Sequence, residues 1–211
     1  MKKQIKNTIN TSSLVAALVI GVIGTIILFK AQSHQSPDAD ASKGSSADSA
    51  QTASSLDELV GKPAPKFSLT DINGKEYSTE NLKGKNVVLF FNEGLMCYPA
   101  CWNQIAKFGS DSRFNSNDTI ALSIVLDPKK DWSEAIAKMP ELAAAKTLFD
   151  DGGYAARAFN VLKLPSSMHY GLLPGHTYVV IDKAGIVRYV FDDPRMAIRN
   201  DDIFAKVQTL K

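Results

Sequence analysis

The chain has 211 residues, of which 45% are hydrophobic, and this is enough for one folded domain with additional segments. The formal net charge is +2, but residues 1–56 contain five lysines and three aspartates, which leaves 19 basic and 19 acidic residues in residues 57–211. Because this larger part is neutral by count, its charge does not indicate nucleic-acid binding. The sequence also contains no glycine-rich phosphate loop, so it does not indicate a nucleotide enzyme.

An uncharged apolar segment begins close to the N-terminus, at residues 14–29. With its neighbours it approaches the roughly 17 to 25 residues that a helix needs to cross a bilayer, so we predict a single transmembrane helix over residues 12–30. Three lysines precede the segment and only one follows it closely, which predicts a short cytoplasmic N-terminus, residues 1–11, and an extracytoplasmic remainder. The alternative is a cleaved signal peptide with a small-residue site at residues 31–33.

A flexible linker is predicted between the anchor and the domain, over residues 31–56. This segment is rich in Ser, Ala, Asp and Gln and cannot bury enough apolar surface to offset the entropy of ordering. The folded domain is therefore predicted to be residues 57–211. In an extracytoplasmic compartment its two cysteines could form a disulfide that persists.

Apolar runs and turn signals along the domain predict an α/β protein. Strands are expected at residues 66–70, 75–78, 87–91, 119–126, 147–149, 177–181 and 186–191. Helices are expected after Pro99, over residues 131–145 with a break at Met139-Pro140, and at residues 154–160 and 200–210, where Asn200 is the expected N-cap. The predicted architecture is a mixed central sheet with helices on both faces.

The two cysteines of the chain, Cys97 and Cys101, lie four residues apart. A predicted buried strand at residues 87–91 and a turn at residues 92–96 precede them, and a helix that begins near Pro99 follows. The spacing predicts Cys97 at the N-terminus of that helix. Unpaired amides and the helix dipole favour a thiolate at such a position, and the thiolate is both the nucleophile and the metal ligand.

The order of these elements resembles that of thioredoxin-fold proteins. More closely, residues 60–191 are similar to the redoxin branch, the alkyl hydroperoxide reductase and thiol-specific antioxidant group that includes peroxiredoxins. The segments that carry this resemblance are residues 61–69, 86–91, 154–161 and 176–182. The resemblance implies a thioredoxin-like fold and thiol-dependent redox chemistry.

The cysteine motif departs from the patterns of that group. Peroxiredoxins carry Pro-x-x-x-Thr-x-x-Cys, but counting back from Cys97 gives Gly94 and Phe90, and counting back from Cys101 gives Tyr98 and Gly94. His176 stands where peroxiredoxin-like sequences usually have Arg. Thioredoxin-like reductants use Cys-x-x-Cys, whereas this chain has Cys-Tyr-Pro-Ala-Cys, which retains the possibility of dithiol chemistry.

The Cys-x-x-x-Cys spacing is also similar to that of the Sco copper-delivery proteins, in which two cysteines and a histidine bind copper. Cys97, Cys101 and His176 are the corresponding candidates here. Two thiolates and an imidazole suit copper in ligand type. Copper delivery is therefore the alternative function.

We predict a membrane-anchored thiol-disulfide oxidoreductase or peroxiredoxin-like antioxidant protein without a cofactor. A disulfide that closes so short a loop removes little entropy from the unfolded chain, so the pair favours a redox or metal role over a structural one. Cys97 is the expected attacker, Cys101 the resolving cysteine, and His176 the third catalytic candidate. The expected partners are a protein disulfide or thiol, or a peroxide.

Three further residues receive structural interpretations. Trp102 is expected in the core, His169 in a solvated loop, and Glu93 as an exposed turn carboxylate.

Overall fold

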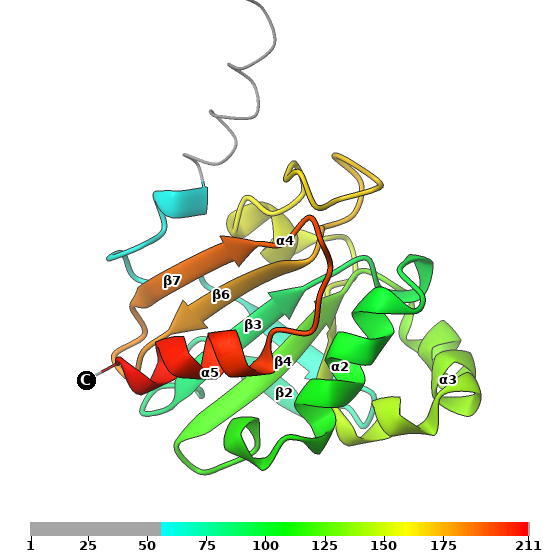
Figure 1. Ribbon diagram of the computed structural model, residues 1–211, viewed down its shortest axis with the longest axis horizontal. Coiled ribbons are helices and arrows are strands. Elements are labelled where there is room, and N and C mark those ends of the chain that lie inside the picture. Colours follow the sequence, from blue (N-terminus) through cyan, green and yellow to red (C-terminus); the bar gives the residue numbers. More distant parts are fainter. Residues whose placement is uncertain (1–55, 211) are drawn as a thin grey trace, which may run out of the picture. The chain divides into compact units, whose positions relative to one another are not determined.

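The computed structural model describes residues 56–210 (Figure 1). The predicted N-terminal segment, residues 1–11, the predicted anchor, residues 12–30, and nearly all of the predicted linker lie outside these residues. Within residues 56–210, no helix is long and apolar enough to cross a membrane.

The described chain forms one seven-stranded sheet with the order β2-β1-β5-β4-β3-β6-β7. The strands are β1 (Ser68–Asp71), β2 (Glu76–Ser78), β3 (Asn86–Phe91), β4 (Thr119–Val125), β5 (Thr147–Phe149), β6 (Thr177–Ile181) and β7 (Val187–Asp192). All seven predicted strands are present, and no end is shifted by more than two residues. The sheet is mixed, as predicted, because β4 pairs in parallel with β3 and β5 while the remaining pairs are antiparallel.

The helices also follow the predicted order. They are η1 (Gly94–Met96), α2 (Ala100–Ser110), η2 (Ser112–Phe114), α3 (Lys129–Lys138), η3 (Pro140–Ala144), α4 (Tyr154–Ala158) and α5 (Asn200–Gln208). The predicted break at Met139-Pro140 is confirmed, since α3 ends before it and a short 3₁₀ helix follows. The prediction that Asn200 caps α5 is wrong: Arg199 occupies the N-cap position, and the Asn200 side chain is buried against α2.

Two apolar clusters cover the two faces of the sheet. Alternate side chains of β3 divide between them, because successive residues of a strand point to opposite faces. Val87, Leu89 and Phe91 pack with α4, whereas Val88 and Phe90 pack with α2, α3 and α5. The predicted helices on both faces are therefore confirmed (Figure 1).

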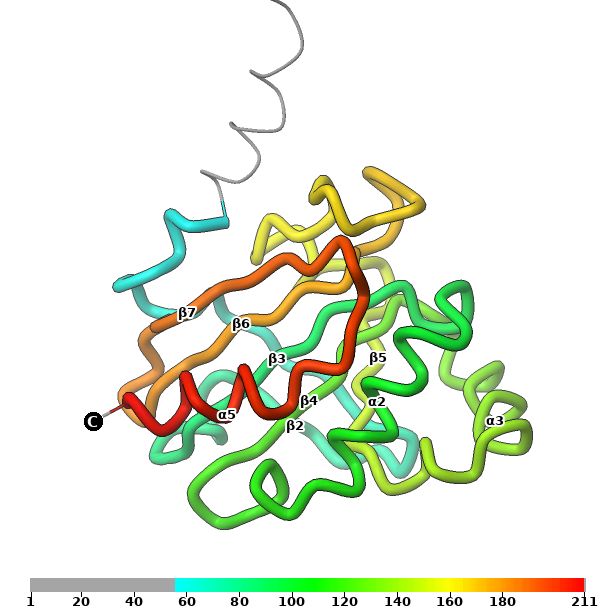
Figure 2. The backbone as a smooth tube through the Cα atoms, in the orientation of Figure 1, coloured from blue at the N-terminus to red at the C-terminus, as the bar shows by residue number. Residues whose placement is uncertain are grey.

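The central crossover runs from β3 through α2 to β4, which pairs in parallel with β3. β6 lies on the other side of β3 and pairs with it antiparallel, from Val87 opposite Ile181 to Phe91 opposite Thr177. The C-terminal end of β3 and the N-terminal end of β6 thus lie side by side at the same end of the strands. Figure 2 shows the segment between β7 and α5 descending beside α2.

Candidate active site

The two cysteines lie at the junction between β3 and α2. After β3 the chain forms the single turn η1, and Cys97 is its C-cap, whereas Pro99 is the N-cap of α2 and Cys101 is the second helical residue. Cys97 was predicted at the helix N-terminus, but it precedes the helix by three residues. The reason is local: the Cys97 amide bonds to the Gly94 carbonyl and thus closes η1 before α2 begins. The amide of Cys101 donates to the carbonyl of Cys97 across 3.0 Å.

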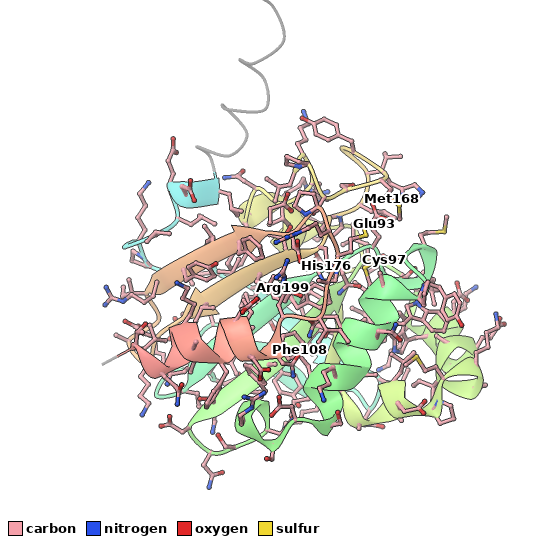
Figure 3. All side chains as sticks on the ribbon, viewed as in Figure 1. Glu93, Cys97, Phe108, Met168, His176 and Arg199 are labelled. Carbon is pink, nitrogen blue, oxygen red and sulfur yellow. A yellow bond between two sulfur atoms is a disulfide. The ribbon has the colours of Figure 1, made fainter. Side chains whose placement is uncertain are left out.

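Cys97 and Cys101 form a disulfide, with 5.3 Å between their Cα atoms. Cys97 is 2% exposed and Cys101 is fully buried, so the disulfide is covered on nearly every side. The cover over Cys97 is Met196, from the segment between β7 and α5. Figure 3 shows Cys97 in the turn before α2, in the same region as Glu93 and His176.

His176 immediately precedes β6 and is fully buried. Its Nδ1 atom lies 3.6 Å from Cys101 Sγ, and its Nε2 atom lies 2.8 Å from the hydroxyl of Tyr178. Its ring meets the Phe90 ring edge to face, with 4.6 Å between the centroids. Burial lowers the pKa of His176 to about 4, so the imidazole beside the disulfide is neutral near pH 7.

The three predicted site residues are therefore brought together. The Cys97 and Cys101 sulfurs and a ring nitrogen of His176 all lie within 4.8 Å of one another. These three residues are also the candidate copper ligands of the alternative function. In the disulfide state, however, neither sulfur is a thiolate, so only the reduced protein could offer these atoms to a metal ion.

A buried polar chain behind His176 was missed in the sequence. The Tyr178 hydroxyl lies 3.0 Å from Gln104 Oε1, and Gln104 Nε2 lies 2.8 Å from Asn200 Oδ1. Two signals could have found it. His176 and Tyr178 are two residues apart on a strand and share a face, and Gln104 is a polar residue on the helix face of Cys101.

The prediction that Glu93 is an exposed carboxylate is wrong, because Glu93 is 1% exposed. Its Oε1 atom accepts hydrogen bonds from the Ser167 hydroxyl and the His169 amide. Its Oε2 atom has no hydrogen-bond partner among residues 56–210. Glu93 therefore connects the loop before β6 to the turn before Cys97 through hydrogen bonds. The His169 side chain is about one third exposed, and its Nδ1 atom lies 3.3 Å from Glu93 Oε1.

The positions that hold Thr and Pro in the peroxiredoxin motif carry no hydroxyl here. Counted from Cys97 they are Gly94 and Phe90. Gly94 has φ +54°, and a Cβ atom there would lie 1.6 Å from Asp127 Oδ2. Its carbonyl accepts a hydrogen bond from the indole of Trp102, which is buried as predicted. Gly94 therefore allows close packing at this turn and offers no hydroxyl group.

A mixed sheet with a cysteine pair between its central strand and the following helix defines a protein of the thioredoxin-fold class. The AhpC/TSA family profile matches residues 60–190, which is more than half of the chain. The chain therefore belongs to the AhpC/TSA family, and the resemblance predicted from the sequence is confirmed.

Individual relatives agree with this assignment. Chloroplastic peroxiredoxin Q of Triticum aestivum is 32% identical over 139 residues, which cover 63% of this chain and 58% of the relative. Chloroplastic peroxiredoxin Q of Sedum lineare is 30% identical over 72% of this chain and 78% of the relative. The chain thus spans less than two thirds of the wheat protein. Among solved structures, peroxidoxin BcpB of Mycobacterium tuberculosis superposes with a TM-score of 0.59 at 23% identity, covering 72% of this chain and 98% of that one, which supports the fold.

Proposed function

We propose that the protein is a thiol-dependent oxidoreductase whose Cys97 and Cys101 alternate between a dithiol and a disulfide. The observation that carries the proposal is the buried Cys97–Cys101 disulfide beside the neutral imidazole of His176, within an AhpC/TSA domain. Peroxiredoxin Q is the name of the curated relatives, and the same class of redox chemistry is proposed for this chain.

The cycle begins with the thiolate of Cys97, the less buried of the two cysteines. With a disulfide substrate, Cys97 forms a mixed disulfide and releases one substrate thiolate. The sulfur of Cys101 then attacks the Cys97 sulfur, which forms the Cys97–Cys101 disulfide and releases the second thiolate. The substrate gains the two electrons that the dithiol loses, and two external thiol groups return them and are themselves oxidised to a disulfide.

With a peroxide substrate, the Cys97 thiolate attacks one oxygen and becomes a sulfenic acid while the other oxygen leaves as an alcohol or water. Cys101 then displaces the sulfenic oxygen as water and closes the same disulfide. Because Gly94 and Phe90 provide no hydroxyl, we propose that the protein activates peroxide less efficiently than it exchanges disulfides.

The test compares reduced wild-type protein with Cys97→Ser and Cys101→Ser, each mixed with hydrogen peroxide or with a disulfide substrate and followed by intact mass. Wild type ends as the internal disulfide. Cys101→Ser is expected to stop at the mixed disulfide or sulfenic acid, and Cys97→Ser is expected not to react in the first step. If Cys97→Ser reacts as fast as wild type, the assignment of Cys97 as the attacking cysteine is wrong. If the wild-type protein turns over neither substrate, the proposed activity is wrong.

Copper binding is the second candidate function, because the Cys97, Cys101 and His176 ligand atoms lie within 4.8 Å of one another. Two thiolates and one imidazole would suit Cu(I) in the reduced protein. A titration of reduced full-length protein against a Cu(I) chelator tests this, with His176→Gln as the variant expected to weaken binding. If the reduced protein takes no Cu(I) from the chelator, this function is excluded.

We also propose that residues 12–30 anchor the protein in a membrane with the domain on the extracytoplasmic side. The support is the uncharged apolar run at residues 14–29 and the lysines that precede it. Protease is added to cells whose cytoplasmic membrane is intact and directly accessible from outside, and this tests the orientation. The domain is expected to be digested without lysis, and a domain protected until lysis would contradict the proposal.

A further inference from the structure

A continuous set of buried contacts runs from the disulfide into the space between α2 and α5. It passes from Cys101 to His176, from His176 to Tyr178, from Tyr178 to Gln104, and from Gln104 to Asn200. Tyr178 and Gln104 are both fully buried. Since no water is needed to complete these contacts, the hydrogen-bond direction at each step is determined by the neighbouring groups.

Main-chain groups fix both side-chain amides. The backbone N–H of Arg199, which can only donate, lies 2.7 Å from Gln104 Oε1, so that atom is the amide oxygen. The backbone carbonyl of Lys107, which can only accept, lies 3.3 Å from Asn200 Nδ2, so that atom is the amide nitrogen. The contact from Gln104 Nε2 to Asn200 Oδ1, at 2.8 Å, agrees with both assignments.

The orientation of Gln104 determines the hydrogen on Tyr178. Gln104 Oε1 accepts only, so the Tyr178 hydroxyl must donate to it across 3.0 Å. The hydroxyl oxygen then has only lone pairs to offer His176 Nε2, at 2.8 Å. His176 therefore carries its hydrogen on Nε2, and the bare Nδ1 of the neutral ring faces Cys101 Sγ.

The opposite tautomer is disfavoured for the same reason. With the ring hydrogen on Nδ1, the bare Nε2 would face the Tyr178 hydroxyl at 2.8 Å. One of the two short contacts of the Tyr178 hydroxyl would then contain no hydrogen, and two lone pairs would face each other in a buried site.

We propose that Gln104 and Tyr178 are positioning residues that hold His176 with a bare Nδ1, so that this atom accepts the thiol proton of Cys101 during disulfide closure. The inference rests on the proposed function. The Cys101 S–H bond breaks as a hydrogen forms on Nδ1, and the thiolate attacks the Cys97 sulfur of the mixed disulfide. The leaving thiolate departs with the electron pair of the broken S–S bond, and the imidazolium returns its proton to that thiolate or to solvent.

The first test is nitrogen NMR of the imidazoles in the oxidised full-length protein. The chain has three histidines, so the spectrum of His176→Gln identifies the resonances of His176 by their loss. We expect a pyrrole-like shift for Nε2 and a pyridine-like shift for Nδ1. A pyrrole-like Nδ1 in the wild-type protein would overturn the proposal, whether or not any variant folds.

The second test changes the relay, by which we mean the hydrogen-bonded series Gln104, Tyr178 and His176. Gln104→Met removes the acceptor of the Tyr178 hydroxyl, which then donates to His176 Nε2 and moves the ring hydrogen to Nδ1. Tyr178→Phe keeps the ring that stacks on Phe90 but removes the hydroxyl. Thr147→Val is the matched control, because the Thr147 hydroxyl is buried without a hydrogen-bond partner in the described part of the chain and lies on β5, outside the relay.

The rates are measured with reduced protein and dithiodipyridine, which releases one chromophore when Cys97 is captured and a second when Cys101 closes the disulfide. General-base assistance contributes about 10²- to 10⁴-fold, so we expect His176→Gln to slow the second release by about 100-fold and Gln104→Met by about 10-fold. The first release should be unchanged in both, and Thr147→Val should match wild type in both.

The proposal is overturned if Gln104→Met folds and changes neither the His176 nitrogen shifts nor the second release. The proposed function fails separately. If the protein turns over neither disulfides nor peroxide catalytically but shows the expected nitrogen shifts and second-release rates, the relay stands and the activity does not.

Discussion

The Sδ atom of Met196 lies 3.9 Å from the Sγ atom of Cys97 and covers the less buried sulfur of the disulfide. Met196 holds φ +49°, a left-handed conformation that is uncommon for residues other than glycine. Asp193 holds the segment in place, since its carboxylate accepts from the amides of Arg195 and Ala197 and from the guanidinium of Arg199. Access to Cys97 thus depends on a segment that is distant in sequence.

Removing this cover should make the disulfide easier to attack. We predict that Met196→Ala accelerates reduction of the Cys97–Cys101 disulfide by dithiothreitol several-fold, because the rate of thiol attack depends on access to the sulfur. Met168→Ala is the matched control, since Met168 is 60% exposed in the loop before β6. Equal reduction rates in the two variants would show that Met196 does not limit access.

Burial of His176 should make stability depend on pH. Its pKa is about 4 in the folded protein and near 6.5 in the unfolded chain, so the unfolded state binds more protons between these values. The free energy of unfolding should therefore fall as the pH is lowered from about 6.5 to 4, by roughly 3 kcal/mol in total. Urea unfolding of the oxidised protein at several pH values in this range measures the free energy of unfolding.

The His176→Gln variant isolates this contribution, because carboxylates titrate in the same range and remain in both proteins. Burial raises the pKa of Asp192 and of Asp127, and these groups contribute equally to the wild type and the variant. The difference between the two pH profiles should therefore show the slope from His176. Parallel profiles would mean that His176 is not held neutral.

The turn before Cys97 should not tolerate a side chain at Gly94. A Cβ atom there would meet Asp127 Oδ2 at 1.6 Å, and φ is +54°. We predict that Gly94→Ala lowers the free energy of unfolding by about 3 kcal/mol, from overpacking and the left-handed backbone together. Gly84→Ala is the matched control, because Gly84 has φ +85° and a Cβ atom there would meet nothing within 4 Å.

Gly84→Ala should cost only the backbone part of this loss, about 1 kcal/mol. Thermal or urea unfolding measures both variants. Equal losses would indicate that Asp127 moves away without cost and that the close packing of the turn is not required.

Glu93 should stabilise the loop that leads to His176. Glu93→Ala removes the carboxylate that accepts from the His169 amide, and a lost buried hydrogen-bond partner costs about 1–3 kcal/mol. Glu93→Gln retains an acceptor oxygen at the same place, so its loss should be smaller. Hydrogen exchange of the His169 amide should quicken in the first variant more than in the second. Equal exchange in both would contradict this role.

Much of the fold could be predicted from local patterns. Apolar runs marked the strands, Met139-Pro140 marked the end of α3, and the spacing of Cys97 and Cys101 marked the pair. These features depend on residues close in sequence, whose periodicity directly expresses which faces are buried. The helix position of Cys97 was wrong by three residues, because the capping of η1 depends on backbone hydrogen bonds that residue types do not specify.

The sequence by itself thus determined the order of the elements and the presence of two closely spaced cysteines. Tertiary structure decided how the predicted His176 meets that pair and which further groups join it. Antiparallel pairing of β6 beside β3 brings His176 to Cys101, 75 residues away in the chain, and packing of α5 brings Arg199 and Asn200 to Gln104. Such contacts arise from the burial of apolar faces on the sheet, which brings together polar partners whose pairing across the chain no local pattern specifies.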